Sequence, residues 1–310
     1  MITEPDTPAV AKVPIVYHND YVTPLPDGHR FPMPKFKLLY DLLLEESVIH
    51  STQVHRPEIA SHVLLEKAHS SEYVTAFCDG TLSEKAVRKI GLPWSEALVT
   101  RTRTAVGGTY LTAKLALDRG LACNLAGGTH HAFSDHGSGF CIFNDMAVVS
   151  QALLDENAVR QILIIDLDVH QGDGTAAIFG DEARVFTFSM HCEKNFPFIK
   201  QKSDSDVSLP VGTPDAAYLG TLKNHLNKLL DEVRPDLVFY DAGVDPHRND
   251  ALGKLSLTDA GLFERDKFVI QSCVDRKIPI ATVIGGGYDK NRRELAYRHS
   301  FVVRAALAMQ

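Results

Sequence analysis

Residues 161–170 read Gln-Ile-Leu-Ile-Ile-Asp-Leu-Asp-Val-His and carry the strongest structural signal in the chain. Four apolar residues lead into Asp166, Asp168 and His170, which are spaced two apart. In an extended strand that spacing places three side chains on one face. Two carboxylates and an imidazole side by side repel each other and are costly to desolvate unless a cation holds them together. Zinc or a similar divalent cation binds this mixture of ligands, so the stretch predicts a buried strand that ends in a catalytic metal site.

Other apolar runs lead into polar clusters in the same way. The runs that include 121–125, 236–241 and 278–284 lead, respectively, into Gly127–His131, Asp241 with Asp245, and Gly285–Tyr288. Polar groups at the carboxyl ends of parallel strands gather at one edge of the sheet, where α/β proteins bind ligands. We therefore expect these clusters to form one site.

The whole chain alternates helical patterns with short β-branched runs. We expect strands at 13–17, 48–50, 121–125, 161–168, 184–189, 236–241 and 278–284, and helices at 35–47, 58–67, 95–119, 144–156, 215–233, 258–276 and 291–308. This alternation predicts an α/β fold, a single domain with a mostly parallel central β-sheet and helices on both faces. The domain is expected to span residues 13–310, after a loose tail at 1–12.

Composition narrows the class of protein. A hydrophobic fraction of 45% suffices for a large core, and a net charge of −7 gives no support to binding of nucleic acid or an anionic membrane. The five cysteines are odd in number and lack CxxC spacing, so we expect reduced thiols and a cytoplasmic protein. Neither a long apolar span nor a signal peptide is evident, and the sequence makes no prediction about oligomeric state.

The polar clusters suggest individual roles. A catalytic zinc needs three protein ligands, and Asp168 and His170 supply two of them; Asp245 is the preferred third, with Asp241 and His247 as rivals. The adjacent His130 and His131 are candidate acid/base groups, because imidazole titrates near neutral pH. Asp166 and Asp173 are the carboxylates available to orient them, and Tyr288, after three glycines, is a candidate donor to an oxyanion.

The motifs resemble those of the zinc-dependent histone deacetylase family, which also includes acetylpolyamine amidohydrolases and acetoin-utilisation proteins. The similarity rests on Gly-Gly-Thr-His-His-Ala (127–132), Ser-Gly-Phe-Cys-Ile-Phe-Asn-Asp (138–145), Ile-Asp-Leu-Asp-Val-His-Gln-Gly-Asp-Gly-Thr (165–175) and Gly-Gly-Gly-Tyr (285–288). It extends from Tyr17 to Tyr288 in the order of the family. The chain looks most similar to class IV deacetylases and their bacterial relatives, which admits acyl groups longer than acetyl.

The resemblance implies an arginase/deacetylase-like fold and a set of site residues. Zinc, with Fe²⁺ as the alternative, is expected on Asp168, His170 and Asp245. His131 is implied as the principal acid/base, paired with Asp173, and His130 as its neighbour, paired with Asp166; Tyr288 polarises the acyl carbonyl. A structural K⁺ is implied near Asp166, Asp168, His170, Ser189 and Met190. The substrate channel is expected to include Phe140, Gly286 and either Phe196 or Phe198.

These features predict a zinc-dependent amidohydrolase that removes an acyl group from lysine in a protein or peptide. The first alternative applies the same chemistry to a small acylated amine such as an acetylpolyamine, for which Glu193, Asp204 and Asp206 are candidate acidic residues at the channel mouth. A binuclear ureohydrolase of the arginase type needs a second set of metal ligands. A non-catalytic binding protein on the same fold is the last alternative.

Overall fold

The computed structural model describes residues 13–309, and the predicted tail over 1–12 lies outside them. Its centre is a sheet of eight parallel strands in the order β2-β1-β3-β8-β7-β4-β5-β6. The strands are β1 (Ile15–Val16), β2 (Val54–His55), β3 (Leu121–Asn124), β4 (Ile162–Asp166), β5 (Val185–Cys192), β6 (Ser205–Leu209), β7 (Leu237–Asp241) and β8 (Ile280–Val283). The predicted α/β architecture is confirmed, and the sheet is parallel throughout the described chain.

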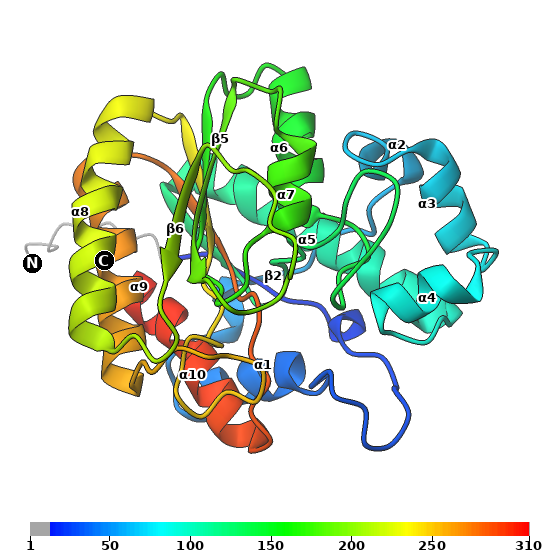
Figure 1. Ribbon diagram of the computed structural model, residues 1–310, viewed down its shortest axis with the longest axis horizontal. Coiled ribbons are helices and arrows are strands. Elements are labelled where there is room, and N and C mark those ends of the chain that lie inside the picture. The colour runs from blue at the N-terminus through cyan, green and yellow to red at the C-terminus, as the bar shows by residue number, and fades with distance from the viewer. Residues whose placement is uncertain (1–12, 310) are drawn as a thin grey trace, which may run out of the picture.

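Helices cover both faces of this sheet (Figure 1). One face carries α1 (Lys35–Glu45), α8 (Asp215–Val233), α9 (Asp259–Asp275) and α10 (Arg292–Leu307). The other carries α5 (Glu96–Arg119), α6 (Asp145–Asp155) and α7 (Asp173–Ile178). Three short helices, α2 (His62–Leu65), α3 (Ser71–Cys78) and α4 (Glu84–Ile90), lie at the periphery beside α5 (Figure 1). Two 3₁₀ turns, η1 (Asn19–Tyr21) and η2 (Ser51–Gln53), precede α1 and β2 in the chain.

Alternation along the central strands explains why both faces are covered. Leu163 and Ile165 of β4 pack into the core under α8–α10, whereas Ile162 and Ile164 pack into the core under α5 and α6. Because successive side chains point to opposite faces, a strand with an unbroken apolar run must be buried on both. Asp166 has the same even-numbered position in the strand as Ile162 and Ile164, so its side chain faces α5 and α6.

Three of the predicted elements need correction. The strand predicted at 48–50 is wrong, because the backbone N–H groups of Val48 and Ile49 donate to the Leu43 carbonyl and close the end of α1. The strand predicted at 161–168 ends at Asp166, so Asp168 and His170 lie in the following loop. The helix predicted at 58–67 is reduced to the single turn of α2.

Close packing explains both the shortened helix and a glycine pair inside α5. A Cβ on Gly107 would lie 1.9 Å from the Glu58 carbonyl oxygen, and one on Gly108 would lie 1.9 Å from the Tyr21 hydroxyl. The extended segment before α2 thus rests directly on the α5 backbone. All five cysteines are free thiols. Within residues 13–309, no helix combines the length and apolar character that crossing a bilayer requires.

Candidate active site

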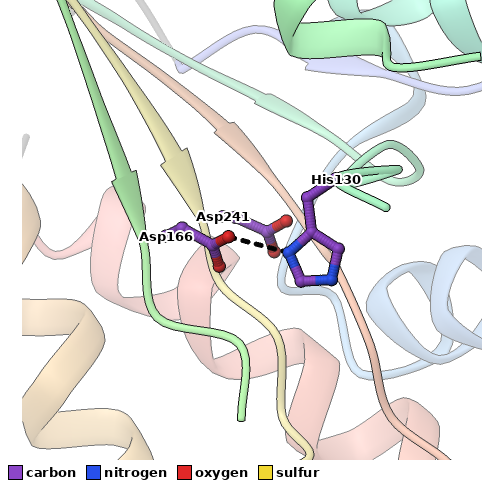
Figure 2. A group of neighbouring side chains, drawn as sticks. All are labelled: His130, Asp166 and Asp241. Atoms are coloured by element: carbon purple, nitrogen blue, oxygen red, sulfur yellow. Dashed lines mark hydrogen bonds and ion pairs between the residues drawn. The ribbon is translucent and has the colours of Figure 1, made fainter. Parts of the chain in front are cut away.

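Two carboxylates face each other where β4 and β7 end. Asp166 and Asp241 are register partners, and by strand parity both point to the α5/α6 face, toward His130 in the loop after β3 (Figure 2). Two like charges directly opposite each other are destabilising. His130 relieves that repulsion because its Nδ1 lies 2.7 Å from Asp166 Oδ2. Asp241 Oδ1 accepts from the Gly243 N–H at 3.2 Å, and its buried Oδ2 has no hydrogen-bond partner among the described residues.

A second cluster consists of Asp168, His170 and Asp245, whose potential ligand atoms lie within 4.8 Å of one another. His170 Nδ1 lies 2.9 Å from Asp168 Oδ1 and 3.2 Å from Asp245 Oδ2. The remaining oxygens are held by the backbone: Asp168 Oδ2 accepts from the Gly286 N–H at 2.8 Å, and Asp245 Oδ1 from the Val169 N–H at 2.8 Å. All three side chains are buried. The cluster is therefore oriented before any ligand arrives.

The electrostatics of this cluster fit a divalent cation. Burial, together with the charge of Asp168, raises the pKa of Asp245 to about 7. Burial acts to lower the pKa of His170, but the bonds to Asp168 and Asp245 outweigh it and raise that pKa to about 10. Imidazole nitrogen and carboxylate oxygen are both zinc ligands, and catalytic zinc sites have three protein ligands, the number that this cluster offers. Asp245 Oδ2 has no well-aligned hydrogen bond within the described chain, as expected of an atom available to a metal.

Asp166 belongs to the first cluster, whereas Asp168 and His170 belong to the second. The expectation that all three side chains lie on one face of a strand is therefore wrong. Because β4 ends at Asp166, the chain turns, and the Asp168 N–H donates to Asp166 Oδ1 at 3.1 Å. The rivals for the third ligand lie elsewhere. Asp241 belongs to the His130 cluster, and His247 Nε2 lies 3.2 Å from Asp259 Oδ1.

The two adjacent histidines have different partners and different electrostatics. Nδ1 of His131 lies 2.6 Å from Asp173 Oδ1, and the rings of His130 and His131 are 4.1 Å apart. Burial, followed by the proximity of His130, lowers the pKa of His131 to about 4. Burial also opposes charge on His130, but Asp166 and Asp168 outweigh it and raise its pKa well above the usual range. The pair therefore offers one neutral and one protonated imidazole at neutral pH.

Tyr288 follows the glycine turn at the end of β8. Its ring lies 6.3 Å from that of His170 and 5.9 Å from that of Phe140. Burial, with the charges of Asp168 and Asp245, raises the pKa of the Tyr288 phenol well above its usual range. The hydroxyl therefore stays protonated and is able to donate a hydrogen bond.

Sequence reasoning missed two residues that hold this turn. Asp250 accepts from the Tyr288 N–H at 2.6 Å and from the N–H groups of Leu252 and Gly253 at 2.8 and 2.9 Å. Buried Lys35 at the start of α1 donates to the Gly285 carbonyl at 2.8 Å, and burial lowers its pKa to about 8. Lys35 gives no sequence signal, since it lies in an ordinary amphipathic helix.

A cavity of about 330 Å³ leads from the surface to His131, His170 and Tyr288. Phe140 and Phe196 form its walls, and the Phe196 ring lies 4.8 Å from that of His131. Phe198 also lines this cavity, at its outer edge, with 91% of its surface exposed. Gly286 lies against the ligand cluster: a Cβ there would be 2.3 Å from Asp245 Oδ2 and 2.4 Å from Asp168 Oδ2.

The residues expected near K⁺ surround the loop after β4. Ser189 of β5 is the register partner of Asp166, and Met190 follows it. Ser189 Oγ lies 3.0 Å from His191 Nδ1. Within residues 13–309, the carbonyl oxygens of Asp168 and His170 accept no hydrogen bond. These oxygens are free for a hard cation, which prefers oxygen ligands.

Comparison with known proteins gives a consistent result. The family model described as "Histone deacetylase domain" matches residues 29–304. An uncharacterized protein of Picosynechococcus sp. is 59% identical over 293 residues, covering 94% of this chain and 98% of that protein. Acetoin utilization protein AcuC of Staphylococcus aureus is 32% identical over 288 residues, covering 85% of this chain and 73% of AcuC. Histone deacetylase 2 of Arabidopsis thaliana is 29% identical over 294 residues, covering 91% of this chain and 76% of that protein.

The fold has a close counterpart among solved structures. The crystal structure of the HDA15 HD domain superposes with a TM-score of 0.80 at 21% sequence identity, covering 97% of this chain and 89% of that one. At this identity the likeness establishes the fold alone.

Proposed function

The chain belongs to the histone deacetylase family, and from that premise we propose that it hydrolyses the amide bond of an acylated lysine with a zinc ion held by Asp168, His170 and Asp245. The family and its relatives support a deacetylase-type amidohydrolase. The observation that carries the finer proposal is the convergence of the Asp168–His170–Asp245 cluster, the His131–Asp173 pair and Tyr288 on one cavity.

The metal and the protein groups divide the work. When bound, zinc supplies a Lewis acid for the acyl carbonyl and lowers the pKa of a water molecule. His131 is neutral, and Asp173 engages its Nδ1, so Nε2 takes the proton of the attacking water. The Tyr288 hydroxyl donates to the oxyanion of the tetrahedral intermediate. A protonated histidine then gives its proton to the leaving lysine amine.

The neighbouring carboxylates give the second histidine, His130, a supporting role. His130 is held by Asp166 and stays protonated. Its ring centroid lies 4.1 Å from that of His131, so a positive charge stands next to the His131 ring. That charge favours the neutral form of His131 before water is activated. We expect K⁺ among Asp166, Asp168, His170, Ser189 and Met190 to fix the loop that carries these groups.

The alternatives find less support. Two of the three acidic residues considered for a polyamine site are engaged elsewhere: Asp204 Oδ2 accepts from Thr187 at 2.8 Å, and Asp206 Oδ1 accepts from Gln171 at 2.8 Å. The third, Glu193, is exposed and is not among the residues that line the cavity. A binuclear ureohydrolase needs free ligands at a second metal, and His130 with Asp166 and Asp241 forms such a group. His130 Nδ1 contacts Asp166 just as His170 Nδ1 contacts Asp168, so the number of metal ions bound per chain is the measurement that separates this alternative from a single zinc site.

An acyl-length series tests the proposal. Lysine peptides carrying acetyl to long-chain acyl groups are incubated with the zinc-loaded protein, with and without a chelator. We expect release of the deacylated peptide, and we expect the chelator to abolish it. The acyl group hydrolysed with the highest kcat/KM defines the acyl preference. Hydrolysis of none of these peptides by protein that holds zinc contradicts the proposed function.

A further inference from the structure

A second groove, of about 600 Å³, opens beside the substrate channel. Its walls come from three segments: residues 28–30, residues 89–91 at the end of α4, and residues 138–140. Phe140 and Arg30 line both the channel and the groove, so the two cavities meet at these side chains. Whatever polypeptide carries an acylated lysine into the channel must pass this junction.

Hydrogen bonds fix the walls of the groove. His29 Nδ1 accepts from the Phe31 N–H at 3.1 Å, so its Nε2 carries the proton and donates to the Gly91 carbonyl at 3.1 Å. The Phe140 N–H donates to the Ile90 carbonyl at 2.7 Å. Phe140 has a φ of 68°, a conformation rare for a non-glycine residue and maintained only where surrounding structure enforces it. The groove is therefore preformed.

The groove has a basic character in an acidic protein. The chain carries a net charge of −7, yet the groove is lined by the cationic side chains of Arg30 and Lys89 and by no acidic residue among those described. Arg30 and Lys89 are exposed, and neither is paired with an acid within residues 13–309. By contrast, the neighbouring Arg88 points to Glu84, with 3.1 Å between Nη1 and Oε2.

We propose that this groove binds the polypeptide on one side of the acylated lysine and selects an acidic side chain there, against Arg30 and Lys89. The inference rests on the proposed function and specifies its substrate class. An extended chain advances about 3.3 Å per residue, so positions next to the lysine reach the groove when the acyl-lysine fills the channel. The same positive charge disfavours a polyamine, whose free amines are cationic.

Matched peptides test the charge preference. The zinc-loaded full chain is given acetyl-lysine peptides that differ only in carrying two Asp, two Ala or two Lys residues on one side of the acetyl-lysine, in separate series for each side, together with acetylspermidine. On the preferred side, we expect kcat/KM for the Asp peptide to exceed that for the Lys peptide by about fivefold, as two exposed ion pairs provide. The preference should diminish at 1 M salt, where screening acts within about 3 Å.

Two charge reversals on α4 locate the effect. Lys89→Glu should abolish or invert the Asp-over-Lys ratio. Arg88→Glu makes the same change of charge one residue away, outside the groove, and should leave the ratio as in the unmodified protein. A ratio that responds equally to both substitutions would mean that overall charge, not the groove, sets the preference, and would overturn the inference.

Different results would contradict the acidic-substrate inference and the proposed function. Hydrolysis of all the peptides at equal rates, or faster hydrolysis of acetylspermidine than of every peptide, overturns the acidic-substrate inference and leaves the amidohydrolase intact. Absence of hydrolysis for every acyl-lysine peptide by zinc-loaded protein contradicts the proposed function, and the inference falls with it.

Discussion

The carboxylate of Asp250 holds the backbone of Tyr288 in place, with 2.6 Å between Asp250 Oδ2 and the Tyr288 nitrogen. The same carboxylate accepts the N–H groups of Leu252 and Gly253, so one side chain joins the loop after β7 to the glycine turn after β8. Asp250 does not itself need to touch substrate. It positions the phenol that we expect to act on the oxyanion.

Replacement of Asp250 therefore should lower kcat more than it raises KM. Asp250→Ala leaves three N–H donors without their acceptor, and we expect kcat to fall by about 10²-fold because small misplacements of catalytic groups have effects of that size. Asp250→Asn keeps the shape and one acceptor oxygen and should be several-fold milder. Steady-state kinetics on an acetyl-lysine peptide measure both, and an unchanged kcat in the alanine variant would remove Asp250 from this role.

Tyr288→Phe should lower kcat by about 10²-fold or more, as loss of one oxyanion donor does, while zinc affinity persists. The phenol is held protonated by burial and by the charges of Asp168 and Asp245, so only the hydroxyl is lost in this variant. Single-turnover kinetics and metal analysis of the same sample separate the two effects. A variant that retains full kcat would exclude Tyr288 from the chemistry.

Gly286→Ala should weaken zinc binding by about 10- to 100-fold, the range found when groups that orient metal ligands are disturbed. A Cβ at this position would lie 2.3 Å and 2.4 Å from the carboxylates of Asp245 and Asp168. Gly220→Ala in α8 is the matched control, because a Cβ there meets nothing within 4 Å. Competition with a fluorescent zinc chelator gives both affinities, and equal affinities would contradict the assigned ligand geometry.

His69 should make folding stability depend on pH. Burial lowers its pKa to about 4; its Nε2 accepts from the Asn144 N–H at 2.9 Å, and its Nδ1 lies 2.9 Å from the Phe133 carbonyl. The unfolded chain, with an ordinary histidine pKa near 6.5, binds more protons between these values, so this stabilisation is present above about pH 6.5 and is lost as pH falls toward 4.

Between pH 7 and pH 5, we expect the contribution of His69 to the free energy of unfolding to fall by about 2 kcal/mol. Denaturant unfolding of the unmodified protein and of His69→Gln at both pH values isolates this contribution, because other groups cancel in the difference. If the two proteins lose equal stability on acidification, His69 is not the group responsible.

Much of the fold follows from sequence, because long elements carry strong patterns. The apolar runs at 162–165 and 237–240 define the central strands, and the boundaries predicted for α8 match the structure. Short or edge elements lack such patterns. Strand β6 has only Val207 and Leu209 as apolar residues, and α3 and α4 are short peripheral helices begun by capping serines.

The arrangement of the site was harder to predict from sequence than the fold, because residue spacing does not show where a strand ends. Asp166, Asp168 and His170 look equivalent in spacing, yet β4 ends at Asp166 and divides them between two clusters. The choice of Asp245 over Asp241 likewise depends on register, which pairs Asp241 with Asp166 and leaves Asp245 to the loop beyond. Lys35 reaches the site through tertiary packing and has no local signal.

The most direct test of the central claim is a zinc titration of metal-free protein, with hydrolysis of an acyl-lysine peptide as the readout. We predict that activity rises from zero and saturates at one equivalent of zinc per chain, and that Asp245→Ala requires far more zinc for any activity. Activity that persists without metal, or that saturates only at two equivalents, would contradict a single zinc ion on Asp168, His170 and Asp245.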